Sequence, residues 1–483
     1  MDRIRIGLDF GTHQTKVCVQ CTPDEGHGEP NYEFFQFEDL MGVKQYFLPS
    51  VIQLNEDNTL SYGYVDESKK KTEPEAPVMP DVELIEEFDV ADTAKKLYEK
   101  YATEENKPED VYVLAEMLNL RLHHIKVKNK VSLNEAEKIY EEQLKEQQEA
   151  RNIFRYFKQA TFIGGEWNRL TSISNRILCI WYLAYIIFLL EERYGENFRI
   201  HMGIPADEES YEAKKRLADE ILASSYRLVE DVYHNSLQDF LNEKKDNLLA
   251  KTVTEKYSED LKLKYQMNIF PEAYANLTAL TSRGKLPDGM SLTADIGGGT
   301  TDISFFTIEE GLPMIYKYWS IPRGLNYVAQ RSGFDYSDGN FKERAQQDVI
   351  DKFNRKKHEL IYNLVRDLKR KIREETSIPV QNLTDALKNR ILVYSGGGST
   401  YDFLTMPIDT FTDIHIIEPS IWNEENIKDK TIVSKLSQLL TTAYGLSVCA
   451  DDEVVKLKSY SSLFSHLPKK HENEIPEISK DQC

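Results

Sequence analysis

The expected fold is decided by two stretches of sequence, GLDFGTHQTKVCV (residues 7–19) and LTADIGGGTTDISFFTI (residues 292–308). Each predicts a strand, a tight turn and a second strand, because apolar runs flank the glycines. Glycine permits positive φ and lets backbone N–H groups approach an anion closely. An Asp ends the first strand of each hairpin, at Asp9 and Asp295. Two such hairpins facing each other could hold the phosphates of a nucleotide, with both Asp residues holding Mg²⁺ through water.

A third stretch, ILVYSGGGSTYDFL (residues 391–404), predicts another buried strand that runs into Gly396, Gly397, Gly398 and then Ser399. One glycine hairpin alone is equally well explained as an ordinary turn. Three strand–glycine turns in this order resemble the phosphate-1, phosphate-2 and adenosine motifs of the superfamily that contains actin, the DnaK-type chaperones and the sugar kinases. The resemblance implies a duplicated RNase H-like α/β fold, with two lobes around a nucleotide cleft and helical insertions.

Further segments resemble that superfamily where it would place them. Lys16, seven residues after Asp9, is similar to the phosphate-contacting Lys of actin and of the plasmid-segregation actin ParM, whereas the string DIGGGTTDIS favours the DnaK-type side. The chain therefore looks closest to a DnaK-like nucleotide-binding domain with some actin-like features, and about 33 residues after position 450 are too few for a peptide-binding domain. The other matching segments are FLPSVIQL (47–54), FRIHMGIPA (198–206), FPEAYANLTAL (270–280), LVRDLKRKIREETS (364–377) and Ala443-Tyr444-Gly445.

The resemblance implies a role for each matching residue. ATP, or ADP after hydrolysis, would bind with Mg²⁺, and phosphoryl transfer would rely mainly on positioning and electrostatic stabilisation. Glu272 would position or activate the attacking water, Lys16 would offset phosphate charge, and Thr300 would bond the γ-phosphate or the water. The implied catalytic residues are Asp9, Lys16, Glu272, Asp295 and Thr300, with Asp9 and Asp295 also serving the metal. The implied nucleotide-binding residues are Gly11, Thr12, His13, Gly297, Gly298, Gly299, Gly324, Lys369, Arg370, Gly397, Gly398 and Ser399.

Simpler explanations exist for several of these residues. Asp9 and Asp302 could accept hydrogen bonds from turn amides. Glu272 could cap the helix that begins near it. Lys369 and Arg370 could be solvated charges on a basic helix face. These alternatives make the side-chain contacts of each residue the deciding observation.

The chain is long enough for two or more domains, and its patterning changes along it. We expect a first lobe over residues 1–290 with charged helical insertions at about 83–160 and 231–268. We expect a second lobe over residues 291–450 with a helical subdomain at about 325–390. Residues 451–483 are polar and predict a tail.

Composition limits the class of protein. The 483 residues carry a net charge of −20, so a general affinity for nucleic acid or for an anionic membrane is not expected. The most apolar run, ILCIWYLAYIIFLL (177–190), is short for a bilayer and predicts a buried helix. No signal peptide is visible and the five cysteines form no disulfide framework, so a cytoplasmic protein is expected.

Three functions remain open on the sequence. The first is a slow ATPase that acts as a nucleotide-dependent switch and engages a protein partner or self-assembles. The second is a small-molecule kinase of the same superfamily, although we find no substrate-binding acidic motif typical of the sugar kinases. The third is a nucleotide sensor or scaffold without hydrolysis, against which Glu272 and the two Asp residues argue mildly.

Overall fold

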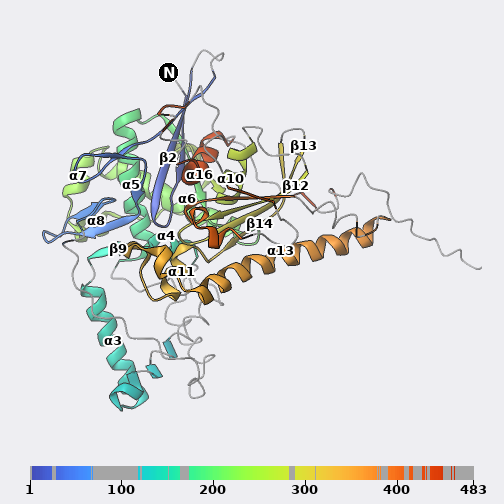
Figure 1. Cartoon of the computed structure of the whole chain (residues 1–483). Helices are drawn as coiled ribbons and strands as arrows, with labels where there is room; N and C mark the ends of the chain where they lie inside the picture. The colour runs from blue at the N-terminus through green and yellow to red at the C-terminus, as the bar shows by residue number, and fades with distance from the viewer. Residues whose placement is uncertain are drawn as a thin grey trace, which may run out of the picture. The chain divides into compact units, whose positions relative to one another are not determined.

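The structure is a computed structural model of the whole chain, and part of the chain is described (Figure 1). The described part comprises residues 3–23, 29–66, 68, 118–119, 122–123, 125–150, 152–163, 173–281, 289–309, 312–377, 379, 381, 390–406, 413–416, 427–429, 431, 436–449, 458–459 and 462. The first part of the expected insertion at about 83–160 and nearly all of the expected tail lie outside it.

The chain divides into two compact units. Unit 1 consists of Met1–Ala279, Trp422–Val433 and Leu440–Asp451, and unit 2 consists of Leu280–Ile421, Ser434–Leu439 and Asp452–Cys483. Residues 440–451, which the sequence suggested for the second lobe, thus belong to unit 1. The reason is close packing: a Cβ at Gly7 would lie 2.2 Å from the carbonyl oxygen of Ala443, and one at Gly445 would lie 1.7 Å from that of Ala275.

The main sheet of unit 1 has the strand order β11-β10-β1-β2-β3, with β6 pairing β2 from the side. Strands β1, β2 and β3 form an antiparallel meander, and β10 and β11 run parallel to β1. Four consecutive residues at the end of β1 are buried, as expected of a strand covered on both faces, and the glycine turn after Asp9 leads into β2. The strands are β1 (Arg3–Asp9), β2 (Gln14–Thr22), β3 (Asn31–Phe34), β6 (Leu48–Pro49), β10 (Phe198–Ile204) and β11 (Met267–Pro271).

Helices cover both faces of this sheet. Side chains alternate between faces along a strand, so Ile6 and Leu8 point to one face while Gly7 points to the other. Ile6 and Leu8 belong to a buried core shared with helices α5 (Asn175–Tyr194) and α6 (Tyr211–Arg227). Helices α10 (Glu272–Thr281) and α16 (Ser437–Val448) pack where Gly7 and Gly203 lack side chains. The sheet is therefore the middle of three layers.

The remaining described elements of unit 1 are strands and helices outside the main sheet. Strand β9 pairs with β7 in a three-stranded sheet of order β8-β7-β9, and β4 pairs with β5. The strands are β4 (Phe37–Glu38), β5 (Lys44–Gln45), β7 (Val51–Leu54), β8 (Leu60–Tyr62) and β9 (Ile153–Arg155). The helices are α3 (Leu133–Ala150), α4 (Phe157–Phe162), the π-helix η4 (Leu228–Val232), α7 (Leu237–Asn242), α8 (Lys245–Lys251) and α9 (Glu259–Lys264).

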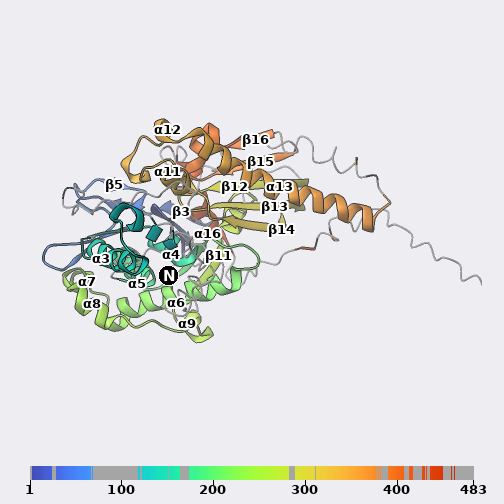
Figure 2. The same cartoon turned by 90° about the horizontal axis from the view of Figure 1, so that it is seen from below.

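Unit 2 repeats the strand order of unit 1. Its sheet has the order β14-β13-β12-β15-β16, again with an antiparallel meander of three strands and two strands parallel to the first. Helix α13 runs along this sheet in both views (Figures 1 and 2), and its apolar residues join the sheet and α11 in one buried core. The strands are β12 (Gly289–Ile296), β13 (Thr301–Glu309), β14 (Leu312–Ile321), β15 (Ile391–Ser395) and β16 (Asp413–Ile416). The helices are α11 (Leu325–Arg331), η5 (Tyr336–Asp338), α12 (Phe341–Arg344), α13 (Gln347–Glu375), η6 (Gly397–Thr400) and η7 (Asp402–Leu404).

The α/β class expected from the sequence is confirmed, and so is the buried helix over the most apolar run. Both expected helical insertions contain a strand. In the first, expected at about 83–160, Ile153 and Phe154 are buried and pair with β7 as strand β9, which interrupts the helical stretch before α4. In the second, expected at about 231–268, the last residues begin strand β11, which pairs in parallel with β10.

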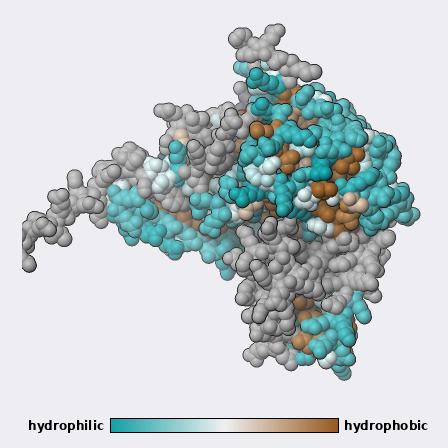
Figure 3. Space-filling view, turned by 180° about the vertical axis from the view of Figure 1, so that it is seen from behind, coloured by the Kyte–Doolittle hydropathy of each residue, from teal (hydrophilic) through white to brown (hydrophobic). Residues whose placement is uncertain are grey.

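One face of the described residues is drawn by hydropathy in Figure 3. On the face drawn in Figure 3, hydrophilic residues dominate and hydrophobic ones form small separate groups. None of the helices built by the described residues combines the length and the apolar character that crossing a bilayer requires.

Candidate functional site

The first glycine turn is built by the β1–β2 hairpin of unit 1. Asp9 and Lys16 are directly opposite each other in the antiparallel register, and the Lys16 ammonium donates to Asp9 Oδ2 at 2.9 Å. The spacing of seven residues thus produces an ion pair across the hairpin. Gly11 lies in the turn, where a Cβ would come within 2.2 Å of the Gln14 carbonyl oxygen. Thr12 and His13 complete the turn and are half-buried.

A second ion pair lies near the first. Glu272 begins α10 directly after β11, and its Oε1 accepts from the Lys158 ammonium of α4 at 2.5 Å. The side chains of Lys158 and Glu272 are only 4% and 12% exposed. Burial raises the pKa of Glu272, with Lys158 opposing the rise and Asp9 adding to it. The four groups therefore form one electrostatically connected, charge-balanced cluster, which we call the acid–lysine cluster (Asp9, Lys16, Lys158 and Glu272).

Lys158 is a site residue that the sequence reasoning missed. It lies 114 residues from its partner Glu272, so no local spacing links the two. One signal was present: Lys158 lies in the aromatic-rich run IFRYFKQATF (153–162), where charged side chains are unusual. Its ammonium also lies 5.6 Å from the centroid of the Phe10 ring.

The second glycine turn connects β12 and β13 in unit 2. Asp295 is opposite Asp302 in the register, so this hairpin carries an acid where the first carries Lys16. Thr300 donates its hydroxyl to Asp302 Oδ2 at 2.8 Å. In this structure the Thr300 hydroxyl hydrogen is therefore used by Asp302. The expected contact of Thr300 with phosphate or water stays a prediction.

The N-terminus of α11 holds the second turn in place. The backbone N–H of Leu325 donates to the Gly297 carbonyl oxygen at 3.1 Å, and that of Asn326 to the Gly298 carbonyl oxygen at 2.8 Å. Gly324 permits this approach, since a Cβ there would lie 2.5 Å from the Gly297 oxygen. Among the expected binding residues, Gly324 thus allows the start of α11 to pack on the second turn. Gly299 is buried within that turn.

The third glycine turn lies beside the second. Strands β12 and β15 are parallel neighbours, with Asp295 level with Ser395. Gly396 has φ +79°, and a Cβ there would lie 2.1 Å from Asp295 Oδ1. Gly398 packs on Ile296 with similar closeness, and the Ser399 hydroxyl donates to the Gly396 carbonyl oxygen at 2.7 Å. Gly397 is half-buried next to them.

The basic pair expected near the adenosine lies on α13. Lys369 is half-buried, whereas the Arg370 side chain is 64% exposed and lies 3.5 Å from Asp367 on the same helix. The structure therefore places Arg370 as a surface charge within an i,i+3 pair. Its expected contact with adenosine stays a prediction.

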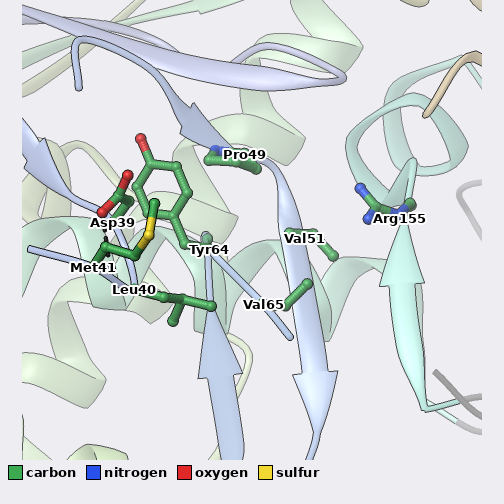
Figure 4. Close-up of a pocket in the computed structure, with 9 residues that line it drawn as sticks. Asp39, Leu40, Met41, Pro49, Val51, Tyr64, Val65 and Arg155 are labelled. Carbon is green, nitrogen blue, oxygen red and sulfur yellow. Dashed lines mark hydrogen bonds between the residues drawn. The ribbon is translucent and has the colours of Figure 1, made fainter. Parts of the chain in front are cut away.

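A cavity of about 450 Å³ lies elsewhere in unit 1. Asp39 lies toward one end and Arg155 at the other, with Pro49, Val51 and Val65 between them (Figure 4). Leu40 and Met41, which also line it, are among the most exposed large apolar side chains of the described residues. Pro49 and Val51 line one wall of the cavity. Ser50, which lies between them in the chain, donates a hydrogen bond to the Gly11 carbonyl oxygen of the first glycine turn.

Within the described ranges, no group of three or more His, Cys, Asp or Glu residues is arranged to hold a metal ion. No protein-family model matches the sequence, and no curated protein matches it.

Proposed function

We propose that this protein binds ATP with Mg²⁺ and hydrolyses it slowly, as a nucleotide-dependent switch of the actin and DnaK-type superfamily that engages a protein partner or self-assembles. The observation that carries the proposal is the buried acid–lysine cluster at the ends of β1 and β11. Two further features support it: the same five-strand order occurs in both units, as a duplicated RNase H-like fold requires, and three glycine turns follow the expected strands.

The glycines and carboxylates at these turns are the residue types that a phosphate ligand and its metal use. At Gly11 a side chain would collide with the Gln14 carbonyl oxygen, and at Gly396 it would collide with Asp295, so both turns require glycine. Asp9 and Asp295 are the carboxylates that would hold Mg²⁺ through water, and the bound ion would neutralise phosphate charge.

The acid–lysine cluster supplies the chemistry that belongs to the chain. Glu272 orients the attacking water and accepts its proton, which requires an ionised carboxylate. Lys158 supports that ionised form against the burial that opposes it. Lys16, paired with Asp9, supplies a second positive charge beside the first turn, where phosphate charge would gather.

The first test is ATP binding and phosphate release by the purified protein with Mg²⁺ and no added acceptor. We expect slow release that is lost in Asp295→Ala and kept in the control Asp348→Ala, whose side chain is 65% exposed. We expect Glu272→Gln to keep binding and to lose release. Binding without release by the intact protein would overturn hydrolysis, and no binding at all would overturn the nucleotide site.

A further inference from the structure

Tyr182 in α5 is completely buried and its hydroxyl reaches the segment that precedes Ser50. The hydroxyl oxygen lies 3.1 Å from the Leu48 carbonyl oxygen and 3.0 Å from that of Pro49. It also lies 3.2 Å from Thr15 Oγ1 on β2. One side chain from the core helix thus contacts both segments that flank the first glycine turn.

The contacts continue from these segments to the turn itself. Thr15 Oγ1 lies 3.3 Å from Ser50 Oγ, and Ser50 donates its hydroxyl hydrogen to the Gly11 carbonyl oxygen at 2.6 Å. The backbone N–H of Ser50 donates to the His13 carbonyl oxygen at 2.8 Å. Two carbonyl groups of the turn are therefore held by Ser50, and their orientation sets the direction of the neighbouring N–H groups.

The hydrogens can be assigned along this chain of hydroxyls, because each hydroxyl donates once. Ser50 gives its hydrogen to Gly11, so Ser50 Oγ can only accept from Thr15. Thr15 then has no hydrogen left for Tyr182, so Tyr182 gives its own hydrogen to Thr15 Oγ1, which completes the chain to the turn. The carbonyl oxygens of Leu48 and Pro49 are the alternative acceptors of that hydrogen. Burial raises the pKa of Tyr182 well above its ordinary value, so the phenol keeps its hydrogen.

The ring of Tyr182 supports the acid–lysine cluster as well. It stacks on Phe10 with 5.6 Å between ring centroids and packs against Phe157 at 5.5 Å. Phe10 follows Asp9 in the chain, and Phe157 precedes Lys158. Tyr182 therefore lies beneath residues adjacent to one member of each ion pair.

We propose that Tyr182 is a positioning residue for the nucleotide site, which acts through Thr15 and Ser50 on the backbone of the Gly11–His13 turn. The inference rests on the proposed function for its ligand, since the turn would bind phosphate. A plain packing role would use only the ring. The positioning role uses the hydroxyl, and the two are separable because Tyr182→Phe removes the hydroxyl alone.

The chain offers a matched control in Tyr226 of α6. Tyr226 is likewise buried and its ring stacks on Tyr265 at 4.8 Å between centroids. Its hydroxyl has no hydrogen-bond partner among the described residues. Tyr226→Phe therefore removes a buried hydroxyl that makes no hydrogen bond to the described residues.

The test compares Tyr182→Phe, Ser50→Ala and Tyr226→Phe in the full-length protein. Hydrogen exchange of the amides at residues 11–15 should become several-fold faster in Tyr182→Phe and Ser50→Ala, and stay unchanged in Tyr226→Phe. The affinity for Mg²⁺–ATP should fall about five- to tenfold in the first two variants, as the loss of one or two hydrogen bonds predicts. The double variant should lose little more than either single one, because both act in one chain.

Two results would overturn the positioning role. One is a Tyr182→Phe protein whose turn exchanges as slowly as that of Tyr226→Phe. The other is an affinity equal to that of the intact protein, with only the unfolding midpoint lowered. If the intact protein binds no ATP, the proposed function fails, while the exchange rates still decide whether Tyr182 holds the turn.

Discussion

Lys158→Met tests the acid–lysine cluster through stability alone. The substitution keeps most of the side-chain volume and leaves Glu272 buried without its nearest positive charge. Removing one partner of a buried ion pair costs about 3–5 kcal/mol. Because Lys16 also favours the charged form of Glu272, we expect the lower end of that range, about 3 kcal/mol.

The cost of Lys158→Met should depend on pH. Burial raises the folded-state pKa of Glu272 above its ordinary value, so its contribution to stability is complete below the unfolded-state pKa and is lost as pH rises through the folded-state pKa. Without Lys158 the folded-state pKa rises further and the loss is larger at neutral pH. The cost of the substitution should therefore shrink as the pH is lowered toward 5.

The assay is urea unfolding followed by tryptophan fluorescence, in which Trp181, buried in α5, reports unit 1. Lys44→Met serves as the control, since that side chain is exposed on β5 of the same unit and should cost less than about 0.5 kcal/mol. The double variant Lys158→Met with Glu272→Gln removes both charges and should recover at least half of the loss. The reasoning is refuted if Lys158→Met costs no more than Lys44→Met, or if the double variant is less stable than the single one.

Further outcomes follow for unit 2. Gly396→Ala should cost about 2–4 kcal/mol, because it adds a Cβ 2.1 Å from Asp295 Oδ1 to the strain of φ +79°. Gly333 has φ +85° and open space around it, so Gly333→Ala should show only the backbone strain, at about 1 kcal/mol. Equal urea midpoints for Gly396→Ala and Gly333→Ala would contradict a collision with Asp295. Burial lowers the pKa of Lys357 to about 7, so its contribution to stability is lost as pH falls through that value, and stability should rise with pH between about 7 and 10.5 by at most about 1.4 kcal/mol per unit. Lys357→Met should remove this increase of the free energy of unfolding with pH, measured by urea unfolding from pH 7 to 9. An unchanged increase would show that Lys357 is not its source.

The local elements were readable from the sequence because their causes are local. The apolar run before Asp9 and the glycine after it predict a hairpin, and seven residues from Asp9 to Lys16 bring the two side chains opposite each other across it. The same argument applies to β12 and β13 around Gly297. Strand β11 was missed because its five residues follow a long charged helical stretch, and its partner β10 lies more than 60 residues earlier.

By itself the sequence determined the α/β class, the glycine turns and the Asp–Lys spacing of the first one, because residues a few positions apart control each of these. Only the tertiary structure decided that Lys158 meets Glu272, that residues 440–451 belong with unit 1, and that Tyr182 reaches the segment before Ser50. These contacts join residues more than 100 positions apart. Their contribution to stability depends on burial, and burial depends on which helix covers which face of a sheet.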